Sequence, residues 1–156
     1  MSRMVTWLND HLAVATGAAE LARRTFSENH DQPYAPDLER LASDLDRERA
    51  AIREVLSTIG SAPSRVKESF GWLSEKVGRL KRNDQIRGYS PLSRLEEFEG
   101  LLLSVASLAM MWRTLERVRG SVGAVDPNDR AEALEGWLDQ LRGVMAEVAE
   151  EALAPA

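Results

Sequence analysis

The chain has 156 residues, no cysteine and a net charge of −5. That length fits one ordinary domain, which buries roughly 68–70% of the surface that the unfolded chain exposes. The lack of cysteine excludes disulfides, thiolate metal sites and cysteine nucleophiles and suits the cytoplasm, where we expect the protein to be. The acidic balance argues against nucleic acid as a partner. Arginine outnumbers lysine by 17 to 3, which is typical of GC-rich bacterial genomes.

The first predicted helix spans residues 6–27. Its apolar residues recur at alternating spacings of three and four, which is typical of one continuous face of a helix. They are Val5, Leu8, Leu12, Ala15, Ala19, Ala22 and Phe26. Asn9, Asp10 and His11 interrupt the apolar run that a signal peptide needs, so we expect the chain not to be exported. Turn formers and two prolines follow in residues 29–36.

The second predicted helix spans residues 36–59 and repeats the same spacing. Its face consists of Leu38, Leu41, Leu45, Glu48, Ile52, Val55 and Ile59, so one member of the set is charged. Gly60 follows as a C-terminal stop. Pro63 then begins another amphipathic stretch, predicted to be a helix over residues 63–82 with Val66, Phe70, Leu73, Val77 and Leu80 on one side.

Two further helices are predicted after residue 90. Ser90-Pro91 is a capped helix start, and the helix over residues 91–119 contains the run LLLSVASLAMMW. This run is apolar on nearly every face and therefore predicts neighbours on all sides. It is much shorter than the ~20 residues that cross a bilayer, so we expect no transmembrane segment. Asp126-Pro127 opens the last helix, at residues 127–152, with an apolar face of Ala131, Leu134, Leu138, Leu141, Met145, Val148 and Ala152.

These elements predict an all-α protein with a single domain over residues 1–156. Three-four alternation suits helices that cross at about +20°, which favours a four-helix bundle. As a helix, residues 63–82 would be roughly 30 Å long and could carry the chain back along the bundle. The second and third long helices would then be parallel, in up-down-down-up order. Five helices in simple antiparallel order are the alternative, and the sequence favours the crossover.

Glu48 is the most informative residue, because Leu45 and Ile52 beside it require an apolar side chain at its position. A buried carboxylate has to be neutralised, paired or bound to a metal. Glu99 is in a similar conflict, with leucines at helical neighbour positions, and Glu96 lies one turn earlier on the same face. His11 is also predicted to face inward, among the apolar residues of the first helix.

Two interpretations of these four residues are open. In one, Glu48, Glu96, Glu99 and His11 form a carboxylate-rich metal site for iron or manganese inside the bundle. In the other, which we favour, no cofactor is present and the carboxylates are paired with Arg49, Arg94, Arg113 or a buried water. His11 is then an ordinary hydrogen-bonded residue of the core.

Residues 65–94 carry a charge of +5, which leaves −10 on the rest of the chain. A basic amphipathic helix with Phe70 and Trp72 could bind an anionic membrane surface or nucleic acid phosphates. We favour the simpler interpretation, a crossover helix with a solvated basic face.

The four long helices, the long connection and the inward glutamates resemble the ferritin-like superfamily. The segments HLAVATGAAELARR and GYSPLSRLEEFEGLLLSVA are also similar to those of small bacterial proteins grouped with it. Its di-iron members use a Glu on two helices and Glu-x-x-His on the other two. This chain has no such motif, since Leu8 and Ser27 lie three residues before His11 and His30. The resemblance therefore implies a member without a di-iron centre.

We expect a non-enzymatic bundle with a structural or protein-interaction role. A homo-oligomer, most simply a dimer through an apolar helix face, fits this role, as does a further protein partner that the sequence does not identify. The alternative is a carboxylate-rich protein that binds iron or manganese, and a weaker alternative is binding to an anionic surface through residues 65–94.

Overall fold

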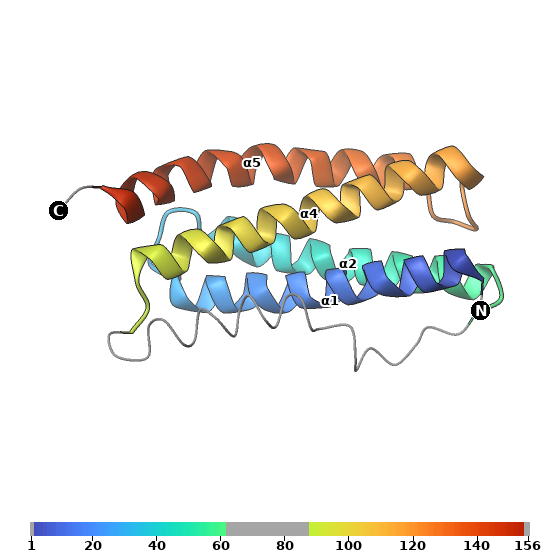
Figure 1. Ribbon diagram of the computed structural model, residues 1–156, viewed down its shortest axis with the longest axis horizontal. Helices are drawn as coiled ribbons and strands as arrows, with labels where there is room; N and C mark the ends of the chain where they lie inside the picture. Colours follow the sequence, from blue (N-terminus) through green and yellow to red (C-terminus); the bar gives the residue numbers. More distant parts are fainter. Residues whose placement is uncertain (1, 62–87, 155–156) are drawn as a thin grey trace.

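Four long helices make up the part of the chain that the computed structural model describes, residues 2–61 and 88–154. They are α1 (Arg3–Glu28), α2 (Ala35–Thr58), α4 (Pro91–Arg119) and α5 (Pro127–Leu153), shown in Figure 1. Their ends lie within about three residues of the predicted ones, so the prediction of an all-α bundle is confirmed. The helix predicted over residues 63–82 lies outside the described residues.

Side-chain caps determine where three of the helices begin. Ser2, Ser90 and Asp126 each accept a hydrogen bond from a backbone N–H in the first turn of α1, α4 and α5. Such a bond satisfies one of the N–H groups that a helix start leaves without a partner. Pro91 and Pro127 occupy the next position, where a missing N–H costs nothing. The starts predicted at Ser90-Pro91 and Asp126-Pro127 are therefore confirmed.

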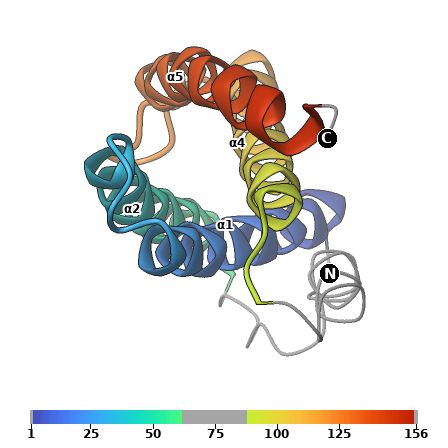
Figure 2. The ribbon, with the colours of Figure 1, turned by 90° about the vertical axis from the view of Figure 1, so that its left-hand side faces the viewer.

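The helices occupy four corners when the bundle is viewed along its axis, in the order α1, α2, α5 and α4 (Figure 2). The backbones of α1 and α2, of α4 and α5, and of α1 and α4 approach one another closely. Between α2 and α5, contact is made by longer side chains such as Trp137, whose indole N–H donates to Asp44 at 2.8 Å.

The diagonal helices α2 and α4 run in the same direction, while each helix is antiparallel to its neighbours at the adjacent corners (Figure 1). Two contacts fix the register of the parallel pair. The rings of Tyr34 and Phe98 meet edge to face with centroids 5.3 Å apart, and the indole of Trp112 donates to Glu48. Both contacts join residues 64 positions apart in the sequence, so each residue of α2 lies at the same level of the bundle as the residue of α4 whose number is higher by 64.

The core is continuous from one end of the bundle to the other, with Trp112 and Phe98 as its largest fully buried side chains. The apolar face predicted for α1 is buried except for the half-buried Phe26. Alanines along this face, including the fully buried Ala15 and Ala19, let the backbone of α1 come close to its neighbours because they have little side chain to separate the helices. The three-four spacing therefore predicts the core correctly.

Helix α4 differs from the expectation that neighbours surround it. Its inner face is buried, but Leu103 and Met110 in its apolar run are 44% and 69% exposed. Among the described helices, α1 and α5 make the close backbone contacts with α4, and Leu103 and Met110 lie outside these contacts. By length and hydropathy α4 alone among the described helices is apolar enough to cross a membrane, although half of that window is buried in the bundle. The core helix of a bundle meets the same criterion.

Candidate functional site

Glu48 lies on the inner face of α2 and is only 3% exposed, as its spacing predicts. Its Oε2 accepts a hydrogen bond of 2.5 Å from the indole N–H of Trp112 on α4. Its Oε1 accepts one of 3.2 Å from the guanidinium of Arg130 on α5. Each carboxylate oxygen therefore has a donor from a different helix.

Burial raises the pKa of the Glu48 carboxyl above its ordinary value, because removing a charge from water favours the neutral form. The hydrogen bond from Trp112 and the charge of Arg130 lower this pKa and offset part of the effect. The prediction that a partner compensates the buried carboxylate is correct, but the arginine is Arg130 and none of the three that were predicted, Arg49, Arg94 and Arg113. Glu48 is a bridge among three helices.

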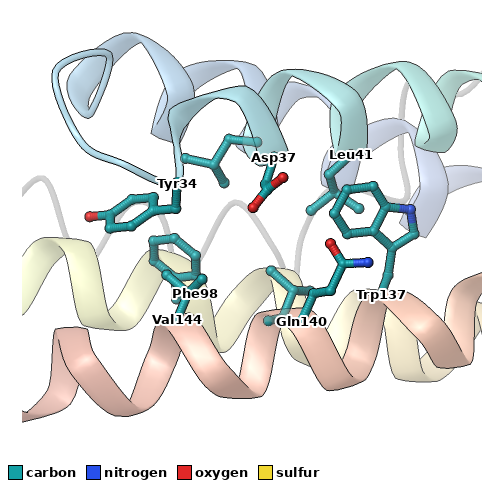
Figure 3. Close-up of a pocket in the computed structure, with 9 residues that line it drawn as sticks. Tyr34, Asp37, Leu41, Phe98, Trp137, Gln140 and Val144 are labelled. Carbon is teal, nitrogen blue, oxygen red and sulfur yellow. The ribbon is translucent and has the colours of Figure 1, made fainter.

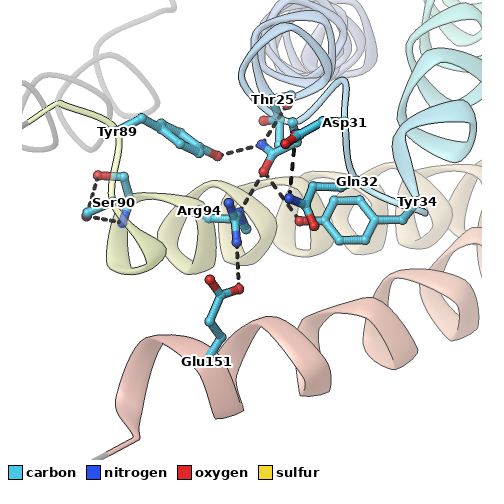
Figure 4. A network of polar contacts seen from close by, with 10 residues as sticks. Thr25, Asp31, Gln32, Tyr34, Tyr89, Ser90, Arg94 and Glu151 are labelled. Carbon is cyan, nitrogen blue, oxygen red and sulfur yellow. Dashed lines mark hydrogen bonds and ion pairs between the residues drawn. The ribbon is translucent and has the colours of Figure 1, made fainter. Parts of the chain in front are cut away.

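A second polar cluster lies where α1 ends and α4 begins (Figure 4). At its centre is Asn29, a fully buried residue that follows α1. Its side-chain N–H donates to the hydroxyl of Tyr89 at 2.7 Å. Its Oδ1 accepts hydrogen bonds from Arg94 Nε at 2.6 Å and from the hydroxyl of Tyr34 at 3.3 Å. One amide therefore connects α1, the start of α2 and the start of α4.

This cluster extends in two directions from Asn29. The Tyr89 hydroxyl donates to Glu97 at 2.9 Å, and the other oxygen of Glu97 forms an ion pair with Arg24 of α1 at 3.1 Å. On the opposite side, Arg94 donates to Glu151 of α5 at 2.6 Å. All four described helices thus meet in one network at this end of the bundle.

Burial dominates the titration of the buried groups in this network. It raises the pKa of the Glu97 carboxyl, while the hydrogen bond from Tyr89 and the charge of Arg24 lower it. Burial also raises the pKa of Tyr89 above its ordinary value, so its hydroxyl keeps the proton that it donates to Glu97. These side chains bond mainly to one another, which is the arrangement of a structural tie between helices.

The structure separates the four predicted metal ligands. Glu48 is buried, whereas Glu96 and Glu99 are exposed, so the prediction that Glu99 faces inward is wrong. The reason is that Leu103, which suggested an apolar face around Glu99, is itself exposed. His11 is half-buried, and its Nδ1 bonds to the Trp7 carbonyl at 2.9 Å. In residues 2–61 and 88–154, no three His, Asp or Glu side chains are grouped to hold a metal ion.

Glu97 and Asn29 are buried members of the second polar cluster that the sequence did not lead us to expect there. Glu97 continues a three-four series through Leu101, Ser104 and Leu108, all of them buried. That series was the available signal for an inward carboxylate on α4. No such signal exists for Asn29, which lies outside the helical pattern, in the turn after α1.

The predicted basic segment, residues 65–94, lies mostly outside the described residues. The structure describes its last residue, Arg94, whose side chain is 13% exposed. Because Arg94 is engaged by Asn29 and Glu151, it is not displayed for binding phosphates or a membrane.

Figure 3 shows one pocket between α2 and α5, with Phe98 of α4 also lining it. The rings of Tyr34, Phe98 and Trp137 line it, with the polar groups of Asp37 and Gln140 beside them. Its internal volume is about 10 Å³, which is room for about one water. An organic ligand would require the two helices to move apart.

The outward surface of α4 differs from the other surfaces of the described chain because it carries most of the exposed large apolar side chains. At about 100° per residue, seven exposed residues fall within a sector of about 60°. We call this surface the outer stripe; it consists of Leu92, Glu96, Glu99, Leu103, Met110, Thr114 and Arg117. The half-buried Ala106 and Ser107 flank the stripe on either side, near the middle of its length. A shallow apolar groove adjoins it, lined by Met4 and Trp7 of α1 and by Val118 of α4.

No protein-family model matches the chain, and neither a curated protein nor a solved structure matches it. What the described residues share with the ferritin-like superfamily is the architecture of four packed helices. The function is therefore inferred from the arrangement of the chain's own side chains.

Replacing Trp112 by Phe should destabilise the bundle because it removes the donor to the buried Glu48 oxygen. A buried polar group left without a partner costs about 1–3 kcal/mol. Trp137→Phe is the matched control, since it loses the same indole N–H but leaves the partly exposed Asp44 with the Arg47 ion pair. We expect urea unfolding at pH 7 to give a free-energy loss larger by about 1–3 kcal/mol for Trp112→Phe. Equal losses would contradict the bridging role of Glu48.

The raised pKa of Glu48 predicts how stability depends on pH. A group whose folded pKa is raised stabilises the fold below its ordinary pKa, here 4.5, and this contribution is lost as the pH rises through the folded pKa. Glu48→Gln removes that loss. We therefore expect the free energy of unfolding of Glu48→Gln, relative to wild type, to increase from pH 4.5 upward.

Urea titrations at several pH values measure this difference, and Glu99→Gln is the control because Glu99 is exposed. A wild-type protein that gains stability relative to Glu48→Gln as the pH rises would show that Arg130 and Trp112 outweigh the cost of burial.

Proposed function

We propose that this chain is a non-enzymatic helical bundle that binds protein through the outer stripe of α4. The observation that carries the proposal is the distribution of exposed apolar side chains. Of the five large ones on the described residues, Leu92, Leu103, Met110 and Val118 lie on α4, and Leu153 lies at the end of α5. Clustered apolar side chains on a surface are typical of an interaction site.

The interior supports a binding role rather than catalysis. Glu48 accepts hydrogen bonds from Trp112 of α4 and Arg130 of α5. Glu97, the other buried carboxylate of the described residues, accepts one from Tyr89 in the turn before α4 and forms an ion pair with Arg24 of α1. The pocket lined by Tyr34, Phe98 and Trp137 has room for about one water. The buried carboxylates therefore hold the helices together, and the surface that is open to a partner is the outer stripe of α4.

We also propose that the bundle is ferritin-like, with its helices in up-down-down-up order. The support is the offset of 64 residues shared by the Tyr34–Phe98 and Glu48–Trp112 contacts, which requires α2 and α4 to run in the same direction. Parallel helices need a connection that returns along the bundle, and 26 residues separate Ser61 from Gly88.

The proposal includes no metal cofactor. Both oxygens of Glu48 are engaged by Trp112 and Arg130, and Glu96 and Glu99 are exposed. We expect protein purified from medium supplemented with iron and manganese to contain only background metal by elemental analysis. About one or two ions per chain would contradict this and would favour the carboxylate-rich metal site.

Site-specific photocrosslinking in living cells tests the binding role of the outer stripe. A benzophenone amino acid at Met110 should yield covalent adducts with protein, because the side chain is 69% exposed at the centre of the stripe. The control places the same amino acid at Gly143 of α5, where an added Cβ meets no atom within 4 Å. Mass spectrometry identifies the adducts.

We expect adducts from position 110 and none above background from position 143. Absence of adducts at position 110, or equal yields at both positions, would overturn the proposed function.

A further inference from the structure

We propose that the outer stripe binds a second copy of this chain, with the two α4 helices packed antiparallel about a two-fold axis between Ala106 and Ser107. The inference rests on the proposed function and names the partner. It follows from the order of charged, apolar and small residues along the stripe, which is complementary to itself when reversed.

The charges on the outer stripe are separated by sign. Glu96 and Glu99 precede its apolar centre, and Arg117 follows it. Within the described part of the chain these three residues form no ion pair, unlike Arg113, which pairs with Glu116 and Glu135. The stripe therefore has an acidic end and a basic end, and neither is neutralised by the described residues.

An antiparallel arrangement centred between residues 106 and 107 pairs the apolar centre of the stripe with itself and Glu96 with Arg117, while Glu99 faces Thr114. Residues whose numbers add to 213 then face each other. Leu103 faces Met110 of the second copy, and Glu96 faces Arg117 of the second copy. Ala106 and Ser107 meet at the axis, where small side chains let two helices approach closely. Each contact occurs twice, as a two-fold interface requires.

The same arrangement explains the exposed residues at the ends of α4. Leu92, which is 51% exposed, would lie at the level of residue 121 of the second copy. That is the end at which Met4, Trp7 and Val118 line the apolar groove. The dimer would therefore cover both the outer stripe and the mouth of this groove.

Other occupants fit the stripe less well. A parallel pair of α4 helices would bring Glu96 and Glu99 next to the same residues of the second copy, and Arg117 next to Arg117, so like charges would repel. An anionic membrane surface would be repelled by the same glutamates. Only the reversed second copy places opposite charges together at both ends.

Analytical ultracentrifugation of the purified full chain gives the association state. We expect a dimer whose dissociation constant rises at least about tenfold in Met110→Glu, because the change buries a charge against Leu103 of the second copy. Leu153→Glu is the matched control, since Leu153 is equally exposed at 66% but lies on α5. Its dissociation constant should stay within about twofold, and all variants should keep the wild-type circular dichroism and melting temperature.

Charge exchange tests the predicted contacts directly. Arg117→Glu should raise the dissociation constant by about tenfold, because two ion pairs become two repulsions. Combining it with Glu96→Arg and Glu99→Arg restores opposite charges at both ends and should return the constant to within about twofold of wild type. A triple variant weaker than Arg117→Glu alone would overturn the proposed pairing.

Disulfide trapping determines the direction of packing, and the cysteine-free sequence gives no background. Neither Leu103→Cys nor Met110→Cys should cross-link by itself, because seven residues on a helix are about 10 Å apart along the axis. An equimolar mixture of the two variants should form a disulfide-linked dimer on oxidation. Cross-linking of each single variant with itself would show parallel helices and overturn the proposal.

The outcomes separate this inference from the proposed function. A chain that is monomeric at every concentration, but yields adducts with a different protein from position 110, would overturn the homodimer and leave the binding role of the stripe. A dimer that Met110→Glu leaves unchanged, with adducts only from position 143, would overturn both.

Discussion

The fold depends on a constraint that the two buried carboxylates impose. An ionised group removed from water has to be met by donors, and breaking such a pair leaves an uncompensated charge that is strongly destabilising. Glu48 on α2 meets this requirement with Trp112 and Arg130, and Glu97 on α4 meets it with Tyr89 and Arg24. Trp112, Arg130 and Arg24 lie on helices other than the one that carries their carboxylate, and Tyr89 lies in the turn that leads into α4.

This constraint is directional, in contrast to hydrophobic contact. Burial of leucine and alanine faces is not directional, so such faces can slide against one another by a helical turn and still bury similar area. A slide of α2 by one turn would remove Glu48 from the indole of Trp112 and place it among apolar side chains. The carboxylates therefore select one register among several that the apolar core would accept. The network around Asn29 does the same at the other end of the bundle.

The sequence predicts much of this fold because the start and the apolar face of a helix depend on residues that are close together in the sequence. Three-four spacing and the Ser90-Pro91 and Asp126-Pro127 starts give helix positions within a few residues, and Leu45 and Ile52 alone show that Glu48 is internal. The partners of Glu48 are not predictable in this way, because Trp112 and Arg130 lie 64 and 82 positions away. Several arginines could compensate the charge of Glu48 equally well, and only the arrangement of the helices in space selects Arg130.

Helix α4 shows where periodicity fails. Apolar residues lie on nearly every side of this helix, so the three-four series through Glu97, Leu101 and Leu108 competes with the leucines around Glu99. The sequence alone therefore does not rank the buried Glu97 above the exposed Glu99 two positions later. The packing of α1 and α5 decides which side faces the core. Because α4 is apolar on nearly every side, some of its apolar residues, Leu103 and Met110, remain on the surface. The proposed contact surface is therefore visible only in the three-dimensional structure.

The pairing of adjacent helices has a kinetic consequence. α1 with α2, and α4 with α5, are two antiparallel hairpins with short connections, and such local contacts form quickly because little chain entropy is lost in closing them. The bonds of Glu48 to Trp112 and of Asn29 to Arg94 exist only after the hairpins have docked. Until then both polar groups remain hydrated, so docking is the step at which water is expelled and the register is chosen.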